Sequence, residues 1–579
     1  MTTADGALPP GGGGLSPQFP RLTSPLWWIE RAFERARASD KPEDDTRLRI
    51  FFVLALFIAG FLTLSLGATK AALFSGLGGG SDSALLPPNA RADLVHYGLY
   101  LDPREVSDIP GTRAALLSAL PALEATRLDK ALRGDHGEYY LLGGLAPEVK
   151  VRVHDLALPG VYFQEETARA YPLGRTGAHI IGFAGKDGTG LAGAERAFNK
   201  DIRAQAGGAP VPLSIDLRVQ GALQDELDSA GAHFQVLGAS GIVVNVRTGE
   251  ILALASYPDF DANHPGASDP AAMINHAAAT VYEPGSVFKV FTLAMGLDSG
   301  VVTVDTTFDV HTPLVLPGQI IHDYDKGDRV LPLWEVFTHS SNIGAARMAL
   351  LAGADRMDKY FHAFGLYSAA PSALVESARP LVPKRLSENA VASMAFGHSI
   401  SISPLAIATG MSSILNGGIY RPLTLRKLEP GQAPALGRRV IQASTSRTML
   451  NLMRLNATIG TGRKADVPGY RVGGKTGTAT KLKNGHYNGE KINLASFAAI
   501  FPTDGPLDQD RYFVLIMMDE PHATPETGGF TTGGVVSAPI AGRVIERIAP
   551  LLGVTRITMP ADDGPKPNVD PSLLTGDER

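Results

Sequence analysis

The 579-residue chain contains no cysteine, which excludes disulfide bonds and thiolate-bound metal sites. It also lacks an excess of positive charge, since 53 Lys and Arg residues stand against 58 Asp and Glu residues and the formal net charge is −5. This balance gives no whole-chain reason to expect nucleic-acid binding. The apolar fraction of 44% and charged fraction of 19% are those of a globular protein, and the length predicts more than one domain.

One long apolar run without charge lies between Ile50 and Leu66, and residues 67–68 extend it. At about 1.5 Å rise per residue, a helix of this length comes close to the roughly 30 Å hydrocarbon core of a bilayer. Seven Lys and Arg residues precede the run and only Lys70 follows it closely, so the positive-inside rule predicts a cytoplasmic N-terminus and an external remainder. The alternatives are a buried core helix or a cleaved signal peptide, but the run starts late for a signal peptide and no clear cleavage site follows.

Composition divides the rest of the chain. Gly, Ser and Pro enrichment predicts linkers after the apolar run and near residues 207–210, and the polar, Pro-rich end predicts a loose tail. The predicted plan is a cytoplasmic tail at 1–49, a transmembrane helix at 50–68, a linker at 69–88, a smaller α+β domain at 89–210, a large domain at 211–556 and a disordered tail at 557–579.

The large domain shows strands at both ends and helical patterns between them. An amphipathic helix is predicted from Ser214, and apolar runs at 242–245 and 250–255 flank a Gly-containing turn, which predicts a hairpin. Further strands are predicted at 495–501 and 512–517, and a last helix at about 540–552. This order predicts an α/β domain in which one sheet is covered by helices.

A first candidate catalytic element is Pro284-Gly285-Ser286-Val287-Phe288-Lys289. On a helix, Ser286 and Lys289 share a face, so the lysine amine can reach the serine hydroxyl. A serine is a poor nucleophile until a base takes its proton, and a lysine serves as that base when burial or a nearby cation lowers its pKa. Alone this pattern is weak, because about one chance S-x-x-K is expected in a chain of this length.

A second element, Ser340-Ser341-Asn342, lies between two predicted helices. Ser340 can relay a proton between the lysine and a leaving group, and Asn342 can hold a substrate amide. Ser and Asn are also common at helix N-caps, and for this motif alone the N-cap is the more frequent explanation.

The third element is Lys475-Thr476-Gly477-Thr478, set in an extended pattern. A strand edge bearing Lys475 and two threonines can bind a substrate carboxylate, and Gly477 keeps that edge free of bulk. The backbone N–H of Thr478 can complete an oxyanion hole with that of Ser286.

Residues 469–476 also match the phosphate-loop pattern G-x-x-x-x-G-K-[ST], and 513–520 resemble the acidic strand of nucleotide hydrolases. A nucleotide hydrolase is therefore the rival from another class. A phosphate loop must lead into a helix, but the sequence after Thr476 is broken by Gly and Asn, and Tyr470 to Val472 favour a strand.

The three elements, present in full and in this order, resemble the S-x-x-K, S-x-N and K-T-G signature of the penicillin-recognising serine enzymes. A single anchor, a pedestal and a C-terminal transpeptidase is the layout of class B penicillin-binding proteins, and residues 169–172, 179–182 and 190–195 are similar to that class. These stretches and residues 214–223 look most like the division-specific, FtsI-type enzymes. The elongation-specific enzymes are the closest alternative.

This resemblance implies the transpeptidase fold with an antiparallel sheet and packed helices, an N-terminal pedestal, and a D,D-transpeptidase that cross-links stem peptides ending in D-Ala-D-Ala during septal wall synthesis. It implies that β-lactams acylate the same serine and that no metal or cofactor is required. The implied catalytic residues are Ser286, Lys289, Ser340 and Lys475, and the implied substrate-binding residues are Asn342, Thr476, Gly477 and Thr478.

The resemblance also implies a single-pass protein of the inner membrane with a periplasmic catalytic domain. The implied partners are the polytopic septal glycosyltransferase and other division proteins, and no nucleic acid. In the pedestal, Arg169 and Glu195 are expected to brace that domain against the catalytic domain.

Two departures from the family pattern stand out. The stretch that follows the anchor is shortened around residues 90–99, and Ser399 occupies a position in Phe396-Gly397-His398-Ser399 where relatives tend to have Gly. A β-lactamase shares the three motifs but rarely has this anchor and pedestal, and a penicillin-sensing receptor carries more membrane spans. A catalytically inactive scaffold is disfavoured by the intact motifs.

Overall fold

The computed structural model describes residues 95–121, 123–135, 137–167, 169–185, 188–204, 210–324, 329–429, 437–481 and 492–557. The predicted tail, transmembrane helix and linker at 1–88 lie outside these residues, as do Ala90 to Leu94 of the shortened stretch and residues 558–579. Within the part of the chain that the structure describes, no helix has both the length and the apolar character needed to cross a bilayer. The chain divides into two compact units, Met1–Pro87 and Pro88–Arg579, and the second contains everything described below.

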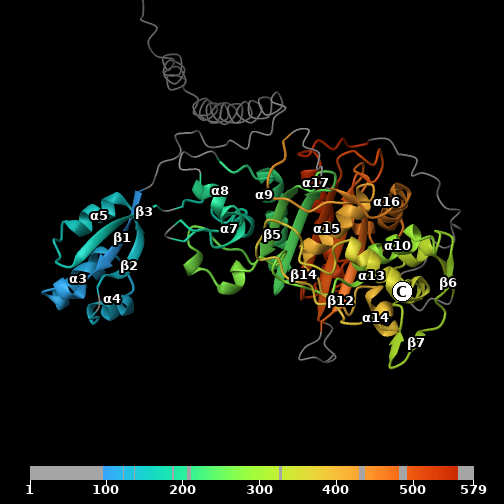
Figure 1. The fold of residues 1–579 in the computed structure, drawn as a ribbon, viewed down its shortest axis with the longest axis horizontal. Helices are drawn as coiled ribbons and strands as arrows, with labels where there is room; N and C mark the ends of the chain where they lie inside the picture. Colours follow the sequence, from blue (N-terminus) through green and yellow to red (C-terminus); the bar gives the residue numbers. More distant parts are fainter. Residues whose placement is uncertain are drawn as a thin grey trace, which may run out of the picture. The chain divides into compact units, whose positions relative to one another are not determined.

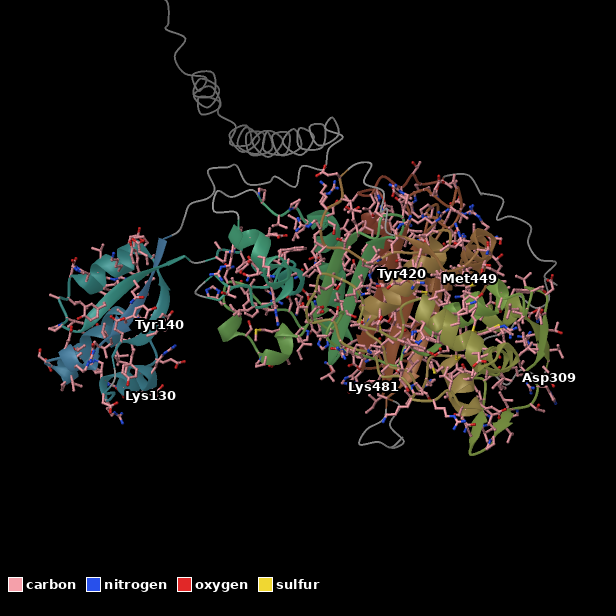
Figure 2. All side chains as sticks on the ribbon, in the orientation of Figure 1. Lys130, Tyr140, Asp309, Tyr420, Met449 and Lys481 are labelled. Carbon is pink, nitrogen blue, oxygen red and sulfur yellow. The ribbon has the colours of Figure 1, made fainter. Side chains whose placement is uncertain are left out.

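The second unit begins with a small sheet-and-helix part. Strand β1 (Val95–Leu101) lies between β2 (Tyr139–Leu145) and β3 (Val161–Thr167), and both pairings are antiparallel. Its helices are α3 (Ile109–Ala119), α4 (Ala125–Leu132) and α5 (Pro147–His154). In Figure 2, the labelled side chains of Lys130 on α4 and Tyr140 on β2 belong to this part. Leu99, Leu116 and Leu128 belong to a hydrophobic core of its own.

The next segment contains the short helices α6 (Ala178–Ile181), α7 (Gly193–Ala197) and α8 (Asn199–Ala204). Arg169 and Glu195 form a two-pronged ion pair with each other, with both N···O distances at 3.0 Å. The recorded bonds to the catalytic part come from other residues: the N–H of Gly177 donates to Gln224 Oε1, and His179 Nε2 lies 2.8 Å from Ala272 O. Two ion pairs also reach the catalytic part, Arg175 with Asp259 and Asp201 with Arg426. The contacts of this segment with the catalytic part therefore involve backbone groups, a buried histidine and charged side chains, whereas Arg169 and Glu195 pair with each other inside the segment.

A five-stranded sheet organises the rest. Its order is β12 (Gly473–Thr480), β13 (Asn493–Phe501), β14 (Tyr512–Asp519), β4 (Gly238–Asn245) and β5 (Ile251–Tyr257), with every neighbouring pair antiparallel. The predicted hairpin and both predicted C-terminal strands are confirmed in this sheet (Figure 1). Strand β12, which carries the third motif, lies at one edge.

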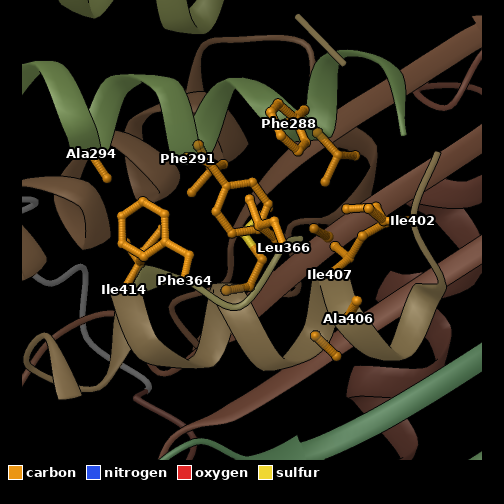
Figure 3. Close-up of a cluster of buried hydrophobic side chains, with 14 of the residues drawn as sticks. Phe288, Phe291, Ala294, Phe364, Leu366, Ile402, Ala406, Ile407 and Ile414 are labelled. Carbon is orange, nitrogen blue, oxygen red and sulfur yellow. The ribbon is translucent and has the colours of Figure 1, made fainter. Parts of the chain in front are cut away.

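Both faces of the sheet are covered by helices, so alternate side chains of the central strands enter different cores. On one face, Phe497 packs in the cluster formed with α9 (Leu217–His233) and α17 (Ser537–Ile548). On the other face, Ala498 joins a larger cluster with α10 (Lys289–Asp298), α15 (Pro404–Leu415) and α16 (Ala443–Thr458). Figure 3 shows part of the larger cluster, where Phe288, just before α10, and Phe291 and Ala294 on α10 face Ala406, Ile407 and Ile414 on α15. Phe364, Leu366 and Ile402 join them from segments outside these two helices.

The remaining described elements belong to the catalytic part, except for one 3₁₀ turn, η2, which follows β1 in the small N-terminal part. The helices are α11 (Leu333–Thr338), α12 (Asn342–Ala352), α13 (Ala354–Ala363) and α14 (Glu388–Met394). The short strands are β6 (Thr307–Asp309), β7 (Leu314–Leu316), β8 (Gln319–Ile321), β9 (Val330–Pro332), β10 (Ile419–Tyr420) and β11 (Arg438–Arg439). The 3₁₀ turns are η2 (Pro103–Glu105), η3 (Pro265–Ala267), η4 (Pro270–Met273), η5 (Gly285–Phe288), η6 (Arg463–Ala465) and η7 (Pro525–Thr527).

Two predicted helix boundaries are wrong, each for a local reason. Helix α9 begins at Leu217 because the Asp216 side chain caps it, while the hydroxyl of Ser214 donates to Ile251 O at 2.8 Å. Helix α17 begins at Ser537 and ends at Ile548, ahead of Pro550, which cannot continue an α-helix.

Candidate active site

The first motif lies where a tight turn meets the edge strand. Residues Gly285–Phe288 form the 3₁₀ turn η5, and α10 continues from Lys289. In a 3₁₀ turn, residues three apart are nearly eclipsed, and Lys289 Nζ lies 3.0 Å from Ser286 Oγ. Gly285 has φ +59°, and a Cβ at this position would lie 2.6 Å from the carbonyl oxygen of Thr478. Only glycine lets the serine turn approach β12 this closely.

The second motif forms a strained turn between α11 and α12. Ser340 has φ +60°, an unfavourable conformation for a residue with a side chain, costing about 1–2 kcal/mol. In this turn the Ser340 carbonyl and hydroxyl oxygens both accept hydrogen bonds from Lys289 Nζ, the hydroxyl at 3.1 Å. Asn342 Oδ1 accepts from the same amine at 2.8 Å. The N-cap of α12 is Ser341, whose hydroxyl accepts from Gly344 N, so the capping role belongs to Ser341 and the other two face the lysine.

Lys475 enters the same cluster from β12. Its Nζ lies 2.9 Å from Ser340 Oγ and 3.1 Å from Thr476 O. The hydroxyl of Ser340 therefore bridges the two lysine amines, and through Lys289 it is connected to Ser286. Four residues from three distant stretches of the chain thus form one continuous hydrogen-bond network.

The two lysines are buried away from solvent. Both Lys289 and Lys475 have 0% exposure. Burial lowers the pKa of Lys475 to about 7. Burial also lowers the pKa of Lys289 well below its usual range, the positive charge of Lys475 lowers it further, and Asp323 acts in the opposite direction. The arrangement favours a neutral amine at Lys289, which can take a proton from Ser286.

The edge strand also carries the two threonines of the third motif. Thr478 Oγ1 accepts a hydrogen bond from the N–H of Gly533 at 3.1 Å, so its own proton remains to be donated. Gly477 lies against the serine turn, where a Cβ would come within 2.7 Å of Val287 and 2.8 Å of Pro284 O. This strand edge offers hydroxyl donors beside an ammonium group, the combination that binds a carboxylate.

The structure of residues 473–480 argues against the alternative of a phosphate loop in a nucleotide hydrolase. After Lys475 and Thr476 the chain continues as strand β12 to Thr480, with no helix at whose N-terminus a phosphate could bind. The two acidic residues at the end of 513–520, Asp519 and Glu520, both form ion pairs with Lys481. Figure 2 marks Lys481, the residue that follows β12.

Comparison with known proteins gives one consistent answer. A family model described as the penicillin binding protein transpeptidase domain matches residues 239–546. The protein named "Probable peptidoglycan D,D-transpeptidase FtsI" of Caulobacter vibrioides is 52% identical over 566 residues, covering 94% of this chain and 96% of the relative. The peptidoglycan D,D-transpeptidase FtsI of Escherichia coli K12 is 31% identical over 83% of this chain and 82% of its own. The chain belongs to the penicillin-binding protein transpeptidases, and within them to the FtsI type.

The fold agrees with this assignment. The transpeptidase domain of Burkholderia pseudomallei penicillin-binding protein 3 superposes with a TM-score of 0.53 at 31% identity, covering 61% of this chain and all of that one. The predicted α/β transpeptidase fold, with its antiparallel sheet and packed helices, is thereby confirmed. The predicted domain boundaries stay predictions.

Several residues of this transpeptidase site have no counterpart in the sequence prediction. Thr461 Oγ1 lies 2.8 Å from Thr476 Oγ1, and the buried Asn456 accepts from the N–H of Thr461 and donates to Gly474 O. The adjacent glycines Gly533 and Gly534 allow the loop to lie on β12. A paired glycine after Thr531-Thr532 was the available signal, but small residues in a loop have many explanations.

Another unpredicted contact joins the serine turn to the loop with the unusual Ser399. The N–H of Gly285 donates to Gly397 O, and Glu283 accepts from Ser399 N at 2.8 Å and contacts His398 Nδ1 at 2.9 Å. Ser399 has φ +60°, a left-handed conformation that glycine adopts without strain and serine rarely does.

Asn342 lies beside the lysine, and its predicted role in holding a substrate amide stays a prediction. Its Oδ1 accepts from Lys289 and its Nδ2 donates to His322 O at 3.2 Å. The amide is therefore engaged on both sides, and a substrate amide would have to displace one of these partners. Asp323, next to His322, is a further residue that the sequence did not reveal, and its contacts are described below.

Proposed function

We propose that this peptidoglycan D,D-transpeptidase acts through an acyl-enzyme at Ser286, with Lys289 as the general base. The observation that carries the proposal is the 3.0 Å contact between Lys289 Nζ and Ser286 Oγ, made by a fully buried amine beside a second lysine. A buried amine next to another cation loses its proton more readily than an exposed one. It is then able to activate a serine hydroxyl.

In the first half of the reaction, Ser286 Oγ attacks the penultimate D-Ala carbonyl of a stem peptide as its proton moves to Lys289. Backbone N–H groups of Ser286 and Thr478 bind the oxygen on which negative charge develops, supported by the close approach of the serine turn to Thr478. The peptide C–N bond then breaks, and the departing D-Ala amine takes a proton through Ser340, which is bonded to both lysines.

The substrate's terminal carboxylate binds at the edge strand. Lys475 supplies positive charge, and the hydroxyl of Thr478 has its proton free because Gly533 occupies its acceptor side. Thr476 is held by Thr461 at the same edge. In the second half of the reaction, an amine of a neighbouring stem peptide attacks the acyl-enzyme and gives a proton to Lys289. The ester C–O bond to Ser286 breaks as the new amide bond forms, and Ser286 Oγ takes that proton from Lys289.

The experiment that tests the nucleophile is labelling with a fluorescent penicillin. Wild-type protein should be labelled covalently, and Ser286→Ala and Lys289→Ala should lose labelling. The matched control is Ser299→Ala, since the Ser299 hydroxyl makes only local bonds to Met295 O and Gly296 O. Equal labelling of Ser286→Ala and wild type would contradict the assignment. Rapid release of the label would instead favour a β-lactamase.

The cellular setting belongs to the same proposal. The apolar run at 50–68 anchors the protein in the inner membrane with its N-terminus in the cytoplasm, the small N-terminal part serves as a pedestal, and the catalytic part works in the periplasm. The FtsI names of its relatives support a septal role beside a polytopic glycosyltransferase and other division proteins. A tagged copy should concentrate at midcell. Even distribution along the side wall would favour the elongation-specific alternative.

A further inference from the structure

A partly buried hydrogen-bond network behind the active site begins at Asp323, two residues after β8. Its carboxylate accepts three hydrogen bonds, all from the first residues of α12: from Ser341 Oγ at 2.6 Å, Asn342 N at 2.5 Å and Ile343 N at 2.9 Å. The N-terminus of a helix stabilises negative charge, and charge-assisted bonds to its free N–H groups are strong. These three bonds fix the Asp323 side chain at the start of this helix.

The same short segment controls the side chain of Asn342. His322 O accepts from Asn342 Nδ2, which assigns the amide orientation and leaves Oδ1 to accept from Lys289 Nζ at 2.8 Å. Asp323 holds the backbone of Asn342 while its neighbour holds the side chain. Two residues that do not touch Ser286 therefore hold one of the groups, Asn342, that position the Lys289 amine.

Among the residues that the structure describes, the charges that act on Lys289 come from two different elements and have opposite signs. Lys475 approaches from β12, and Asp323 approaches from the segment after β8. The other groups bonded to the amine are uncharged: Ser286, Ser340 and Asn342. Lys475 disfavours the ammonium form of Lys289, and Asp323 favours it.

We propose that Asp323 is a positioning residue for acylation, which holds Asn342 against the Lys289 amine and supplies the negative charge that counters Lys475. The proposal deepens the function proposed above and rests on Lys289 as the base. Without Asp323, the amine would lose its proton at lower pH but would be less well placed.

The test is the pH dependence of acylation by a fluorescent penicillin, measured on the full chain in detergent. Asp323→Asn removes the charge and keeps the size, so the acid limb of the rate profile should move to lower pH while the plateau rate falls. The matched control is Ser341→Ala, which loses the helix cap and one bond to Asp323 but keeps the charge. It should keep the wild-type midpoint.

A uniformly lower rate in Asp323→Asn with an unmoved acid limb would overturn the proposal, since a purely structural role predicts that result. If Asp323→Asn does not fold, Asp323→Glu carries the test, because it keeps the charge and disturbs the bonds to α12. A slower reaction with the wild-type midpoint is expected, and a midpoint displaced to lower pH would count against the proposal. Persistent labelling of Lys289→Ala would instead contradict the proposed function itself.

Discussion

Replacing Lys475 by methionine should stabilise the folded protein while abolishing acylation. Burial lowers the pKa of Lys475 to about 7, against an ordinary value of 10.5. At about 1.4 kcal/mol per pH unit, this difference corresponds to a cost of roughly 4–5 kcal/mol for the charged amine at neutral pH. Methionine is of similar length and carries no charge, but it loses the bonds to Ser340 Oγ and Thr476 O. A net gain of about 1–3 kcal/mol is expected.

The stabilisation expected from Lys475→Met depends on pH. Because the folded-state pKa lies below the unfolded-state value, the cost is fully present below about pH 7 and fades as the pH rises toward 10.5. The difference in unfolding free energy between Lys475→Met and wild type should therefore shrink by about 3 kcal/mol between pH 6.5 and pH 9.5. Urea unfolding at several pH values measures it, followed by the fluorescence of Trp334 on α11.

The matched control is Lys481→Met, at the end of the same strand. Burial lowers the pKa of Lys481, but hydrogen bonds and charge from Asp519 and Glu520 outweigh burial and raise it. This lysine contributes stability at neutral pH, so its replacement should destabilise the protein. Equal stability of Lys475→Met and wild type at pH 6.5, or a difference that does not shrink at higher pH, would refute the reasoning.

Two further predictions concern the surroundings of the site. Ser399→Gly should raise the unfolding free energy by about 0.5–1 kcal/mol and leave penicillin acylation intact, because φ +60° strains serine but not glycine; a destabilised variant in urea unfolding would contradict this. Thr461→Val removes the hydroxyl that holds Thr476, so the second-order acylation rate should fall about tenfold for β-lactams that carry a carboxylate. A tenfold change corresponds to the loss of one interaction of about 1.4 kcal/mol. Stopped-flow rates equal to those of wild type would show that Thr461 does not orient Thr476.

Much of the fold could be predicted from the spacing of the three motifs and from the apolar runs in the sequence. The runs at 495–501 and 512–517 are apolar except for Ser496, as expected of strands that the sheet buries on both faces. The residues of the three motifs also meet in space as the resemblance implied. Helix ends were less predictable, since one polar side chain, Asp216, decides where α9 begins.

The residues that surround the catalytic site could not be predicted from the sequence. Asp323 follows a three-residue strand and has no local pattern of its own, and its partners lie about twenty positions further along the chain. Glu283 and His398 are 115 positions apart in the sequence and meet only because two turns pack together. Such residues acquire their roles through tertiary contacts, and a single sequence contains no periodicity that marks them.

The unfavourable features of this chain converge on a few atoms. Two lysines are buried, Ser340 adopts a left-handed conformation, and Gly285 replaces a side chain with a close backbone approach. Each lowers stability, and a core built for stability alone would have none of them. Their meeting around the hydroxyl of Ser340 is explained if the amine of Lys289 must stay neutral beside Ser286 while the amine of Lys475 stays available to an anion. Asp323 then limits how far the pKa of Lys289 is lowered, because a lysine with too low a proton affinity would be too weak a base for serine.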